Sequence, residues 1–358
     1  MKTARVQKLC EKMRANGVDQ MIVTSKANLY YFTGAWLDPM HRLLALIINA
    51  DGSSLYYVNR LFSIDPCVRT ELVFWDDVED PIEKMAGAIR DGAVVAVDQD
   101  WQARFLLALM QARPGAKYIN MPGLIDDLRA IKDQEELDLL AHSSHINDQV
   151  MGRLLENIRP DRTEAQLARM RYEMFAELGA NAYGCNCIFS YGPHCAEPHH
   201  VSDDTLLKPG DSIMIDMGAP YQHYYSDMTR TVFYKEVSPE METVYNTVLK
   251  AHLTAAEAIR PGVPCSEIDR IARDIITDAG YGVWFNHRTG HGIGLDTHEF
   301  PDISQSCERL LQPGMVFSVE PGIYLPGKGG VRVECLFVCT EDGHYCINEY
   351  PRDLRIID

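Results

Sequence analysis

The chain has 358 residues, of which 46% are hydrophobic and 24% charged, so it is long enough for two or three domains with buried cores. Its formal net charge of −17 argues against nucleic acid as a partner, because phosphate backbones attract basic surfaces. No apolar run approaches the roughly 18 residues of a membrane helix, and the charged N-terminal segment lacks the apolar core of a signal peptide. We therefore expect a globular protein with neither a membrane nor a nucleic acid as its partner.

The 10 cysteines show no framework spacing. In a chain without a secretion signal they are typical of reduced thiols, which indicates a cytoplasmic protein. Cys185, Cys187 and Cys195 come closest to forming a cluster. A thiolate metal site there would need a fourth ligand and usually a C-x2-C step, so buried or incidental thiols are the favoured interpretation.

Residues 1–120 alternate between helical and strand patterns. The segment 6–17 ends at Gly17 as a capped helix does, residues 19–25 and 43–50 have the apolar character of strands, and residues 92–100 form a buried strand that leads into another helix. This alternation predicts an α/β domain over residues 1–125.

The second domain is expected to span residues 126–358. A dense charge run near residue 130 leads into a long helix, and a second helix over 162–180 starts with a capping box formed by Thr163 and Gln166. A third helix over 265–281 carries apolar residues on one face, and Ser266 is the expected N-cap. Each helical region is followed by a β-rich stretch.

These β-rich stretches repeat each other. LKPGDSIMIDMG (207–218) and LQPGMVFSVEPG (311–322) share L-x-P-G, five residues, a carboxylate, one residue and then glycine. Both continue into a second strand with another acid, Asp227 in the first copy and Glu334 in the second. The repetition predicts two halves of one α+β domain related by a pseudo-twofold axis.

Strand periodicity directs the acids of both copies, Asp216, Asp227, Glu320 and Glu334, toward one cavity. Four carboxylates cannot all stay ionised there without cations, because like charges raise one another's pKa. Bound divalent metal ions would neutralise these charges and let all four carboxylates stay ionised. A nitrogen ligand is available in the glycine-rich stretch 287–299, where His291 lies between glycines, although such glycines are equally typical of a tight turn.

The chain resembles the metal-dependent aminopeptidase P, prolidase and methionine aminopeptidase family. The resemblance depends on motifs that occur in this order: D-x10-D, GHGIG with a later His-Glu, VEPGIY and GVRVE. The resemblance covers residues 126–358, and residues 1–125 are similar to the N-terminal domain of the aminopeptidase P and prolidase branch. It implies an α/β N-terminal domain followed by an α+β pita-bread catalytic domain with an internal pseudo-twofold repeat.

The resemblance also implies functions for individual residues. Two divalent metal ions per subunit are expected, with Mn²⁺ favoured by oxygen-rich ligation and Co²⁺, Zn²⁺ or Fe²⁺ as alternatives. The implied metal ligands are Asp216, Asp227, His291, Glu320 and Glu334. Glu320, His199 and His298 are the implied catalytic residues, and the implied substrate-binding residues are His199, His287, His298 and Arg332. His200 has no counterpart in the family, and we expect a structural role for it.

The implied activity is hydrolysis of the bond between an N-terminal residue and proline in a small peptide. The order of preference between dipeptides and longer peptides stays open, because Arg309, the one arginine between His298 and Glu320, cannot be aligned with the arginine that some prolidases use. A creatinase-like amidinohydrolase would dispense with the metals, a non-catalytic binding module would lose several ligands, and a methionine aminopeptidase would lack the first domain.

Three further positions bear on this interpretation. Cys335 follows Glu334 where the family has aspartate, and on a strand it should point away from the metals; His223 replaces a glycine that is common in the turn before Asp227. The segment 28–34, NLYYFTG, resembles the family segment that reaches a partner subunit's active site in a homodimer. It is equally consistent with a strand edge on which Tyr30 and Phe32 share a face.

Overall fold

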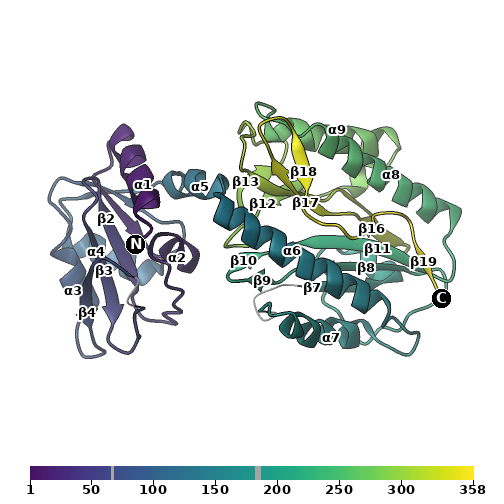
Figure 1. Cartoon of the computed structure of the whole chain (residues 1–358), viewed down its shortest axis with the longest axis horizontal. Coiled ribbons are helices and arrows are strands. Elements are labelled where there is room, and N and C mark those ends of the chain that lie inside the picture. Colours follow the sequence, from purple (N-terminus) through teal and green to yellow (C-terminus); the bar gives the residue numbers. More distant parts are fainter. Residues whose placement is uncertain (66–67, 182–186) are drawn as a thin grey trace. The chain divides into compact units, whose positions relative to one another are not determined.

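A six-stranded sheet organises the first of two units into which the chain divides, Met1–Arg129 and Ala130–Asp358. The computed structural model describes residues 1–65, 68–181 and 187–358 (Figure 1). The strand order is β4-β3-β2-β1-β5-β6, where β1 pairs antiparallel with β2 and parallel with β5. These strands are β1 (Gln20–Val23), β2 (Ala45–Asn49), β3 (Ser54–Asn59), β4 (Glu71–Trp75), β5 (Val94–Val97) and β6 (Lys117–Asn120).

Five helices accompany this sheet in sequence: α1 (Thr3–Ala15), α2 (Lys26–Thr33), α3 (Pro81–Ala86), α4 (Ala103–Ala112) and α5 (Gly123–Ala130). The predicted alternation of helix and strand is present, and Gly17 follows the C-cap of α1 with a φ of 66°. The predicted division after residue 125 falls inside α5, so the domain boundary stays a proposal.

The segment 28–34 is helical, and the expectation of a strand edge there is wrong. Ser25 caps α2 by accepting a hydrogen bond from the Asn28 N–H, and Gly34 ends the helix with a φ of 76°. Glycine adopts this left-handed conformation without steric cost, which makes it a frequent helix terminator. In a helix Tyr30 and Phe32 do not share a face.

The second unit contains two similar halves. The first half has helices α6 (Gln134–Leu155) and α7 (Glu164–Glu177) and the sheet β19-β11-β8-β7; the second has helices α8 (Pro239–Glu257) and α9 (Cys265–Asp278) and the sheet β13-β12-β14-β17-β18. The strands of the first sheet are β7 (Cys187–Tyr191), β8 (Ser212–Met217), β11 (Met228–Tyr234) and β19 (Ile356–Ile357). Those of the second are β12 (Gly290–Gly292), β13 (Glu299–Ile303), β14 (Val316–Val319), β17 (Cys335–Cys339) and β18 (His344–Cys346).

Short elements complete this unit. Two hairpin pairs stand apart from the larger sheets, β9 (Pro220–Tyr221) with β10 (Tyr224–Tyr225), and β15 (Gly322–Leu325) with β16 (Gly329–Arg332). The described residues also include the 3-10 helices η2 (Gly192–Ala196) and η3 (Gly282–Trp284). The turn between β9 and β10 holds Gln222 and His223 at φ values of 46° and 74°, which explains why glycine would suit position 223.

The two halves confirm the predicted internal repeat. One buried core joins α6 and α7 to β7, β8 and β11, while another joins α8 and α9 to β14, β15 and β17. The matching L-x-P-G sequences, residues 207–210 and 311–314, directly precede β8 and β14, and Figure 1 shows β8 between the two helix pairs. The acids at the ends of these strands therefore meet in the middle of the unit.

The helix caps agree only in part with prediction. Thr163 and Gln166 form the capping box of α7, as expected. Ser266 does not cap α9, which begins at Cys265 after the N-cap Pro264. The first N–H groups of α9 donate instead to backbone carbonyls, Cys265 to Arg309 and Ser266 to Cys307. Backbone carbonyl groups of a neighbouring segment therefore accept the hydrogen bonds of the first N–H groups of α9, so the Ser266 hydroxyl is not needed as a cap.

Among the helices of the described ranges, none combines the length and the apolar character that crossing a bilayer requires.

Candidate metal centre

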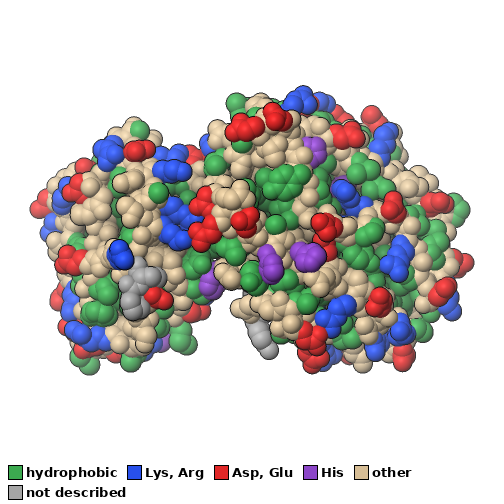
Figure 2. Space-filling view, in the orientation of Figure 1, with side chains coloured by type: hydrophobic (Ala, Val, Ile, Leu, Met, Phe, Trp, Pro, Cys, Tyr) green, Lys and Arg blue, Asp and Glu red, His purple; other side chains and the backbone are tan. Residues whose placement is uncertain are grey.

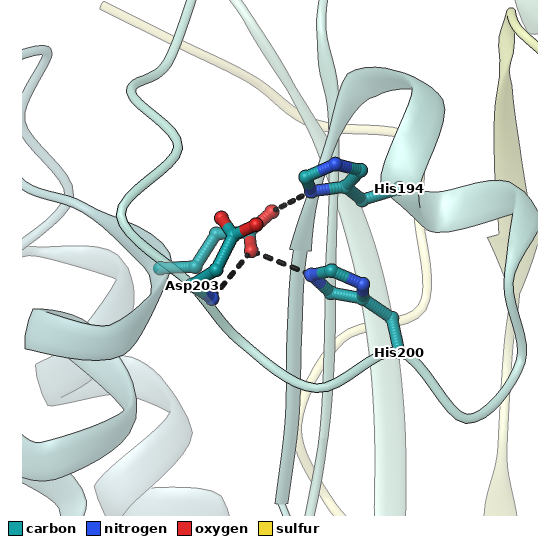
Figure 3. A group of neighbouring side chains, drawn as sticks. His194, His200 and Asp203 are labelled. Carbon is teal, nitrogen blue, oxygen red and sulfur yellow. Dashed lines mark hydrogen bonds and ion pairs between the residues drawn. The ribbon is translucent and has the colours of Figure 1, made fainter.

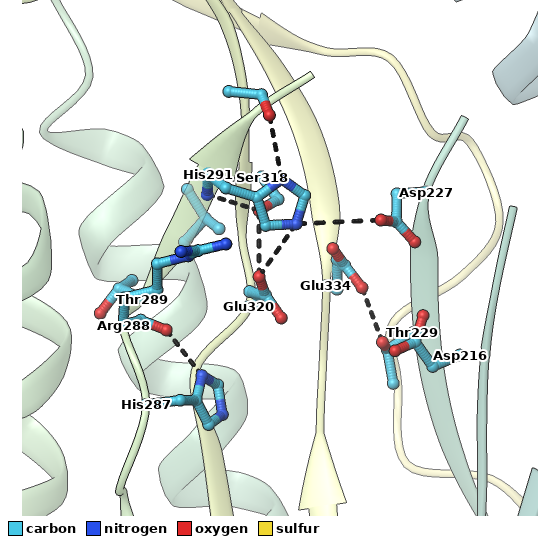
Figure 4. A network of polar contacts seen from close by, with 12 residues as sticks. Asp216, Asp227, Thr229, His287, Arg288, Thr289, His291, Ser318, Glu320 and Glu334 are labelled. Atoms are coloured by element: carbon cyan, nitrogen blue, oxygen red, sulfur yellow. Dashed lines mark hydrogen bonds and ion pairs between the residues drawn. The ribbon is translucent and has the colours of Figure 1, made fainter. Parts of the chain in front are cut away.

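The predicted acids lie at the ends of strands from both halves. Asp216 is in β8 and Asp227 directly precedes β11, and the antiparallel register of these strands pairs Asp216 with Thr229. Glu320 directly follows β14, and Glu334 lies between β16 and β17. In Figure 4 the side chains of Glu320, Glu334, Asp227 and His291 point toward one another.

Three of these residues form the tightest group. Asp227, His291 and Glu334 are buried, and each offers a ligand atom that lies within 4.8 Å of the other two. The His291 Nε2 atom is 3.3 Å from Glu320 Oε1 and 3.9 Å from Asp227 Oδ2. Asp216 lies close enough to Asp227 to raise the pKa of Asp227, and Asp216 Oδ2 accepts a hydrogen bond from the Arg332 guanidinium.

His291 is held as a neutral ligand. Its Nδ1 is 3.0 Å from the Gly292 carbonyl oxygen, which places the proton on Nδ1 and leaves the Nε2 lone pair facing the carboxylates. Burial lowers the pKa of His291 to about 3. An unprotonated imidazole with a fixed tautomer is what metal ligation requires.

Glycine is needed on both sides of His291 because the neighbouring strands lie too close for a side chain. A Cβ on Gly290 would lie 1.9 Å from the Ser318 carbonyl oxygen of β14, and one on Gly292 would lie 2.6 Å from the Phe300 carbonyl oxygen of β13. Real Cβ atoms do not approach so closely, so β12 can lie between its neighbours only with glycine at these positions. A tight turn is therefore not the reason for these glycines.

The carboxyl groups resist ionisation in the absence of cations. Burial, followed by the charges of Asp216 and Glu320, raises the pKa of Asp227 well above its usual value. Burial and the charge of Asp227 raise the pKa of Glu334 well above its usual value. Burial and the charge of Asp216 raise the pKa of Glu320 to about 7. Each group needs a positive partner to be charged at neutral pH.

One buried atom of this group has no partner among the described residues. Glu334 Oε2 accepts a hydrogen bond of 2.7 Å from the Thr229 hydroxyl, but Glu334 Oε1 has none. A buried carboxylate oxygen without a hydrogen bond is unfavourable unless a cation binds it. This oxygen, the neutral His291 and the four clustered carboxylates together fit divalent metal ions.

A second polar network adjoins the acids. Tyr324 in β15 lies between two predicted substrate residues, with its hydroxyl 2.7 Å from His287 Nε2 and 2.9 Å from Arg332 Nη1. Arg332 also donates to Thr229 at 3.0 Å and to Asp216, so it connects this network to the acids. Strand alternation places Thr229 on the same face as Asp227. Sequence reasoning missed Tyr324, which lies in β15, beyond the end of β14 and paired with β16.

The two remaining predicted histidines, His199 and His298, are exposed to solvent. The ring of His298 packs edge-on against that of His291, with centroids 4.2 Å apart. His199 is close enough to His287 and His298 for its charge to lower their pKa values. Figure 2 shows histidine side chains beside carboxylates on the surface of the larger unit.

Two further positions considered in the sequence analysis are Cys335 and Arg309. Cys335 receives a hydrogen bond of 3.4 Å from Arg230, while its neighbour Glu334 contacts Thr229, so the two side chains point in opposite directions as predicted. The Arg309 guanidinium lies 5.7 Å from the centre of the Phe300 ring.

The thiolate alternative is not supported. Neither of the two potential metal-binding groups among the described residues includes a cysteine, and Cys185 lies outside the described residues. The cysteines of the described ranges are free thiols.

Comparison with known proteins identifies the family. Residues 138–341 match the model of metallopeptidase family M24, and residues 5–131 match the creatinase/prolidase N-terminal domain. The chain belongs to metallopeptidase family M24. An uncharacterized peptidase of Staphylococcus aureus (strain MRSA252) is 32% identical to this M24 metallopeptidase, over 97% of this chain and 99% of that protein.

Solved structures agree with this assignment. A recombinant prolidase from Thermococcus sibiricus is 32% identical and has a TM-score of 0.95, covering 100% of this chain and 99% of that one. An Xaa-Pro dipeptidase from Bacillus anthracis is 29% identical with a TM-score of 0.90, and the match covers both chains fully. These matches confirm the predicted fold class, an α/β N-terminal domain followed by a pita-bread catalytic domain. They do not favour an amidinohydrolase or a binding module.

Proposed function

We propose that this M24 metallopeptidase hydrolyses the peptide bond between an N-terminal residue and proline in small peptides, with two divalent metal ions per subunit. The observation that carries the proposal is the buried group of Asp227, His291 and Glu334, in which Glu334 Oε1 has no partner among the described residues. The prolidase and the Xaa-Pro dipeptidase reported above supply the substrate class.

The residues that would hold the ions are Asp216, Asp227, His291, Glu320 and Glu334. Four carboxylates balance the charge of two divalent cations, and the mainly oxygen ligand set favours Mn²⁺ over metals that prefer thiolates. When bound, such ions polarise a carbonyl group and lower the pKa of water toward neutrality. Asp216 would bind them beside Arg332, whose guanidinium donates a hydrogen bond to Asp216 Oδ2.

Glu320 is the proposed proton carrier. Its carboxylate lies among the proposed metal ligands, with Oε1 3.3 Å from His291 Nε2, and there it can accept a proton and return it. The Ser318 hydroxyl orients Glu320 by donating to Oε1 at 3.2 Å. The leaving proline nitrogen needs such a proton, because it departs as a secondary amine.

His298 and His199 are the proposed contacts to the reacting peptide. Although the His298 side chain is exposed, partial desolvation by its surroundings lowers its pKa. At neutral pH its imidazole is therefore uncharged and can donate an N–H hydrogen bond to the oxygen that gains negative charge. His287 and Arg332 are proposed to bind the substrate, and Tyr324 fixes both of them.

Assembly and location complete the proposal. We infer a cytoplasmic homodimer in which helix α2 helps to close the partner's substrate pocket, as in the family that the segment 28–34 resembles. The free thiols are consistent with a reducing compartment. Light scattering of the purified protein tests the dimer. A variant Tyr30→Ala, at the partly exposed aromatic of α2, that remains dimeric with an unchanged KM would contradict the role of α2.

The decisive experiment strips the protein of metal and restores it with Mn²⁺. The substrates are Leu-Pro, Gly-Pro, an Xaa-Pro-Xaa tripeptide, Met-Ala-Ser and creatine. We expect metal-dependent cleavage of the Xaa-Pro compounds alone, and the ratio between dipeptide and tripeptide rates gives the length preference. Cleavage of creatine by the stripped protein, or of Met-Ala-Ser by the restored one, would overturn the proposal.

A further inference from the structure

A second group of potential ligands lies outside the metal centre. Glu164 at the start of α7, His194 in η2, and His200 and Asp203 in the loop before β8 each offer a ligand atom, and these four atoms lie within 4.8 Å of one another. Both imidazoles contact the carboxylate of Glu164, and Figure 3 shows His194, His200 and Asp203 close together. None of these residues belongs to the proposed catalytic set.

The group has a buried centre and an accessible edge. The Glu164 side chain is fully buried, the His200 side chain is 9% exposed and that of His194 is 31% exposed, while Asp203 is at the surface. A buried anchor fixes the geometry, and the exposed edge gives an ion from solvent a way in.

The distances suit a small tetrahedral ion. The His194 Nδ1 atom is 3.0 Å from Glu164 Oε1, and the His200 Nε2 atom is 2.7 Å from Glu164 Oε2. Around a tetrahedral Zn²⁺ with bonds of about 2.1 Å, neighbouring ligand atoms are about 3.4 Å apart. Small shifts of the two imidazoles and the exposed Asp203 would therefore create such a site.

The surroundings already orient the ligands. The backbone N–H groups of Tyr191 and Asp203 donate to the two Glu164 oxygens at 2.7 and 3.1 Å. The other ring nitrogen of His200, Nδ1, is 3.8 Å from a Glu197 carboxylate oxygen. That distance is too long for a hydrogen bond, so Glu197 contributes negative charge near His200 without fixing its tautomer.

From this geometry we propose that Glu164, His194, His200 and Asp203 form a zinc site separate from the metal centre. Two imidazole nitrogens with two carboxylates select Zn²⁺ over the hard cations, which prefer oxygen ligands alone. His200 is the chain neighbour of His199, so a bound ion would also restrain the backbone that carries a proposed substrate contact. The expected structural role of His200 thereby becomes a role in metal binding.

The test separates this site from the dinuclear centre by mutation. The full-length chain, stripped with a chelator and dialysed against Zn²⁺, is compared as wild type, as the double variant Asp227→Asn/Glu334→Gln, and as the same double variant with His194→Ala added. We expect the double variant to retain one zinc ion per chain and the triple variant to lose it. His145→Ala on the exposed face of α6 is the matched control and should leave the zinc content of the double variant unchanged.

X-ray absorption at the zinc edge of the double variant is expected to show imidazole nitrogens and carboxylate oxygens without sulfur. Circular dichroism and a thermal melt establish that each variant is folded before its metal content is interpreted. A folded double variant without zinc, or a triple variant that keeps it, would overturn the proposal and show that the four residues serve only as a hydrogen-bonded cluster. A wild type that binds a single ion, lost with His194→Ala but not with the double change, would uphold this site and refute the dinuclear centre.

Discussion

At the scale of single residues, the charge of Asp227 decides whether the metal centre can form. Asp227→Asn preserves shape but removes one of the four charges that balance two divalent ions. We expect turnover to fall by more than about 100-fold, the upper range of losses seen even for groups behind the ligands, together with a lower metal content. Steady-state assays and elemental analysis measure both.

Asp161→Asn, a change at an exposed position, is the control for Asp227→Asn and should leave activity and metal content unchanged. The fold should survive in both variants, because burial already disfavours the Asp227 charge when metal is absent. Wild-type turnover in Asp227→Asn would refute the two-ion arrangement.

Tyr324 gives a residue-scale prediction that the sequence did not offer. Tyr324→Phe removes the hydroxyl that accepts from Arg332 and contacts His287. A buried donor left without its partner costs about 1–3 kcal/mol, so we expect kcat/KM to fall by about 10-fold or more while metal content stays at the wild-type level. Tyr345→Phe, on an exposed tyrosine, is the control. If Tyr324→Phe has the kcat/KM of the wild type, this network does not bind substrate.

At the scale of elements, local patterns predicted some boundaries and missed others for a physical reason. The capping box of α7 is made by its own residues, so sequence alone reveals it. The start of α9 depends on carbonyl groups of residues 307 and 309, which no local pattern shows. The helix at 26–33 was missed because its aromatic residues also suit a strand, although Ser25 and Gly34 mark its ends.

The strand β12 provides the element-scale prediction. Gly290→Ala would place a Cβ within 1.9 Å of the Ser318 carbonyl oxygen, so β12 must move away from β14. We expect a loss of about 1–3 kcal/mol in the free energy of unfolding, measured by denaturant titration, and reduced metal affinity because His291 moves with the strand. Gly123→Ala, where a Cβ meets nothing within 4 Å, is the control and should be close to neutral.

At the scale of the whole molecule, the internal repeat is the sequence feature that predicted the two half-domains and the meeting of their acids. Because the acid occupies the same place in each copy, two matching half-domains imply that Asp216 and Glu320 approach one another, and the structure places both at the centre of the second unit. The repeat could not show that Arg332 binds Asp216 or that Glu334 Oε1 has no partner among the described residues. Those details depend on side-chain packing between strands that are distant in sequence.

The last prediction concerns how metal and pH together determine the stability of the larger unit. In the metal-free protein the pKa of Glu320 is raised from 4.5 to about 7, so the folded state holds a proton that the unfolded chain releases in this interval. The stability is therefore fully present below about pH 4.5 and is lost as the pH rises through about 7. This single group accounts for about 3 kcal/mol, and the raised pKa values of Asp227 and Glu334 act in the same direction.

Divalent ions reverse this dependence, because they bind the ionised carboxylates and replace the protons. We expect the Tm of the metal-free protein to fall by several degrees between about pH 5 and pH 7.5, at about 2–4 °C per kcal/mol for a domain of this size. The Mn²⁺-loaded protein should gain stability over the same range, so the two curves diverge as the pH rises. Calorimetry at constant ionic strength measures both, and Glu320→Gln should flatten the metal-free curve. Parallel curves for the loaded and stripped proteins would show that no cation stabilises these carboxylates.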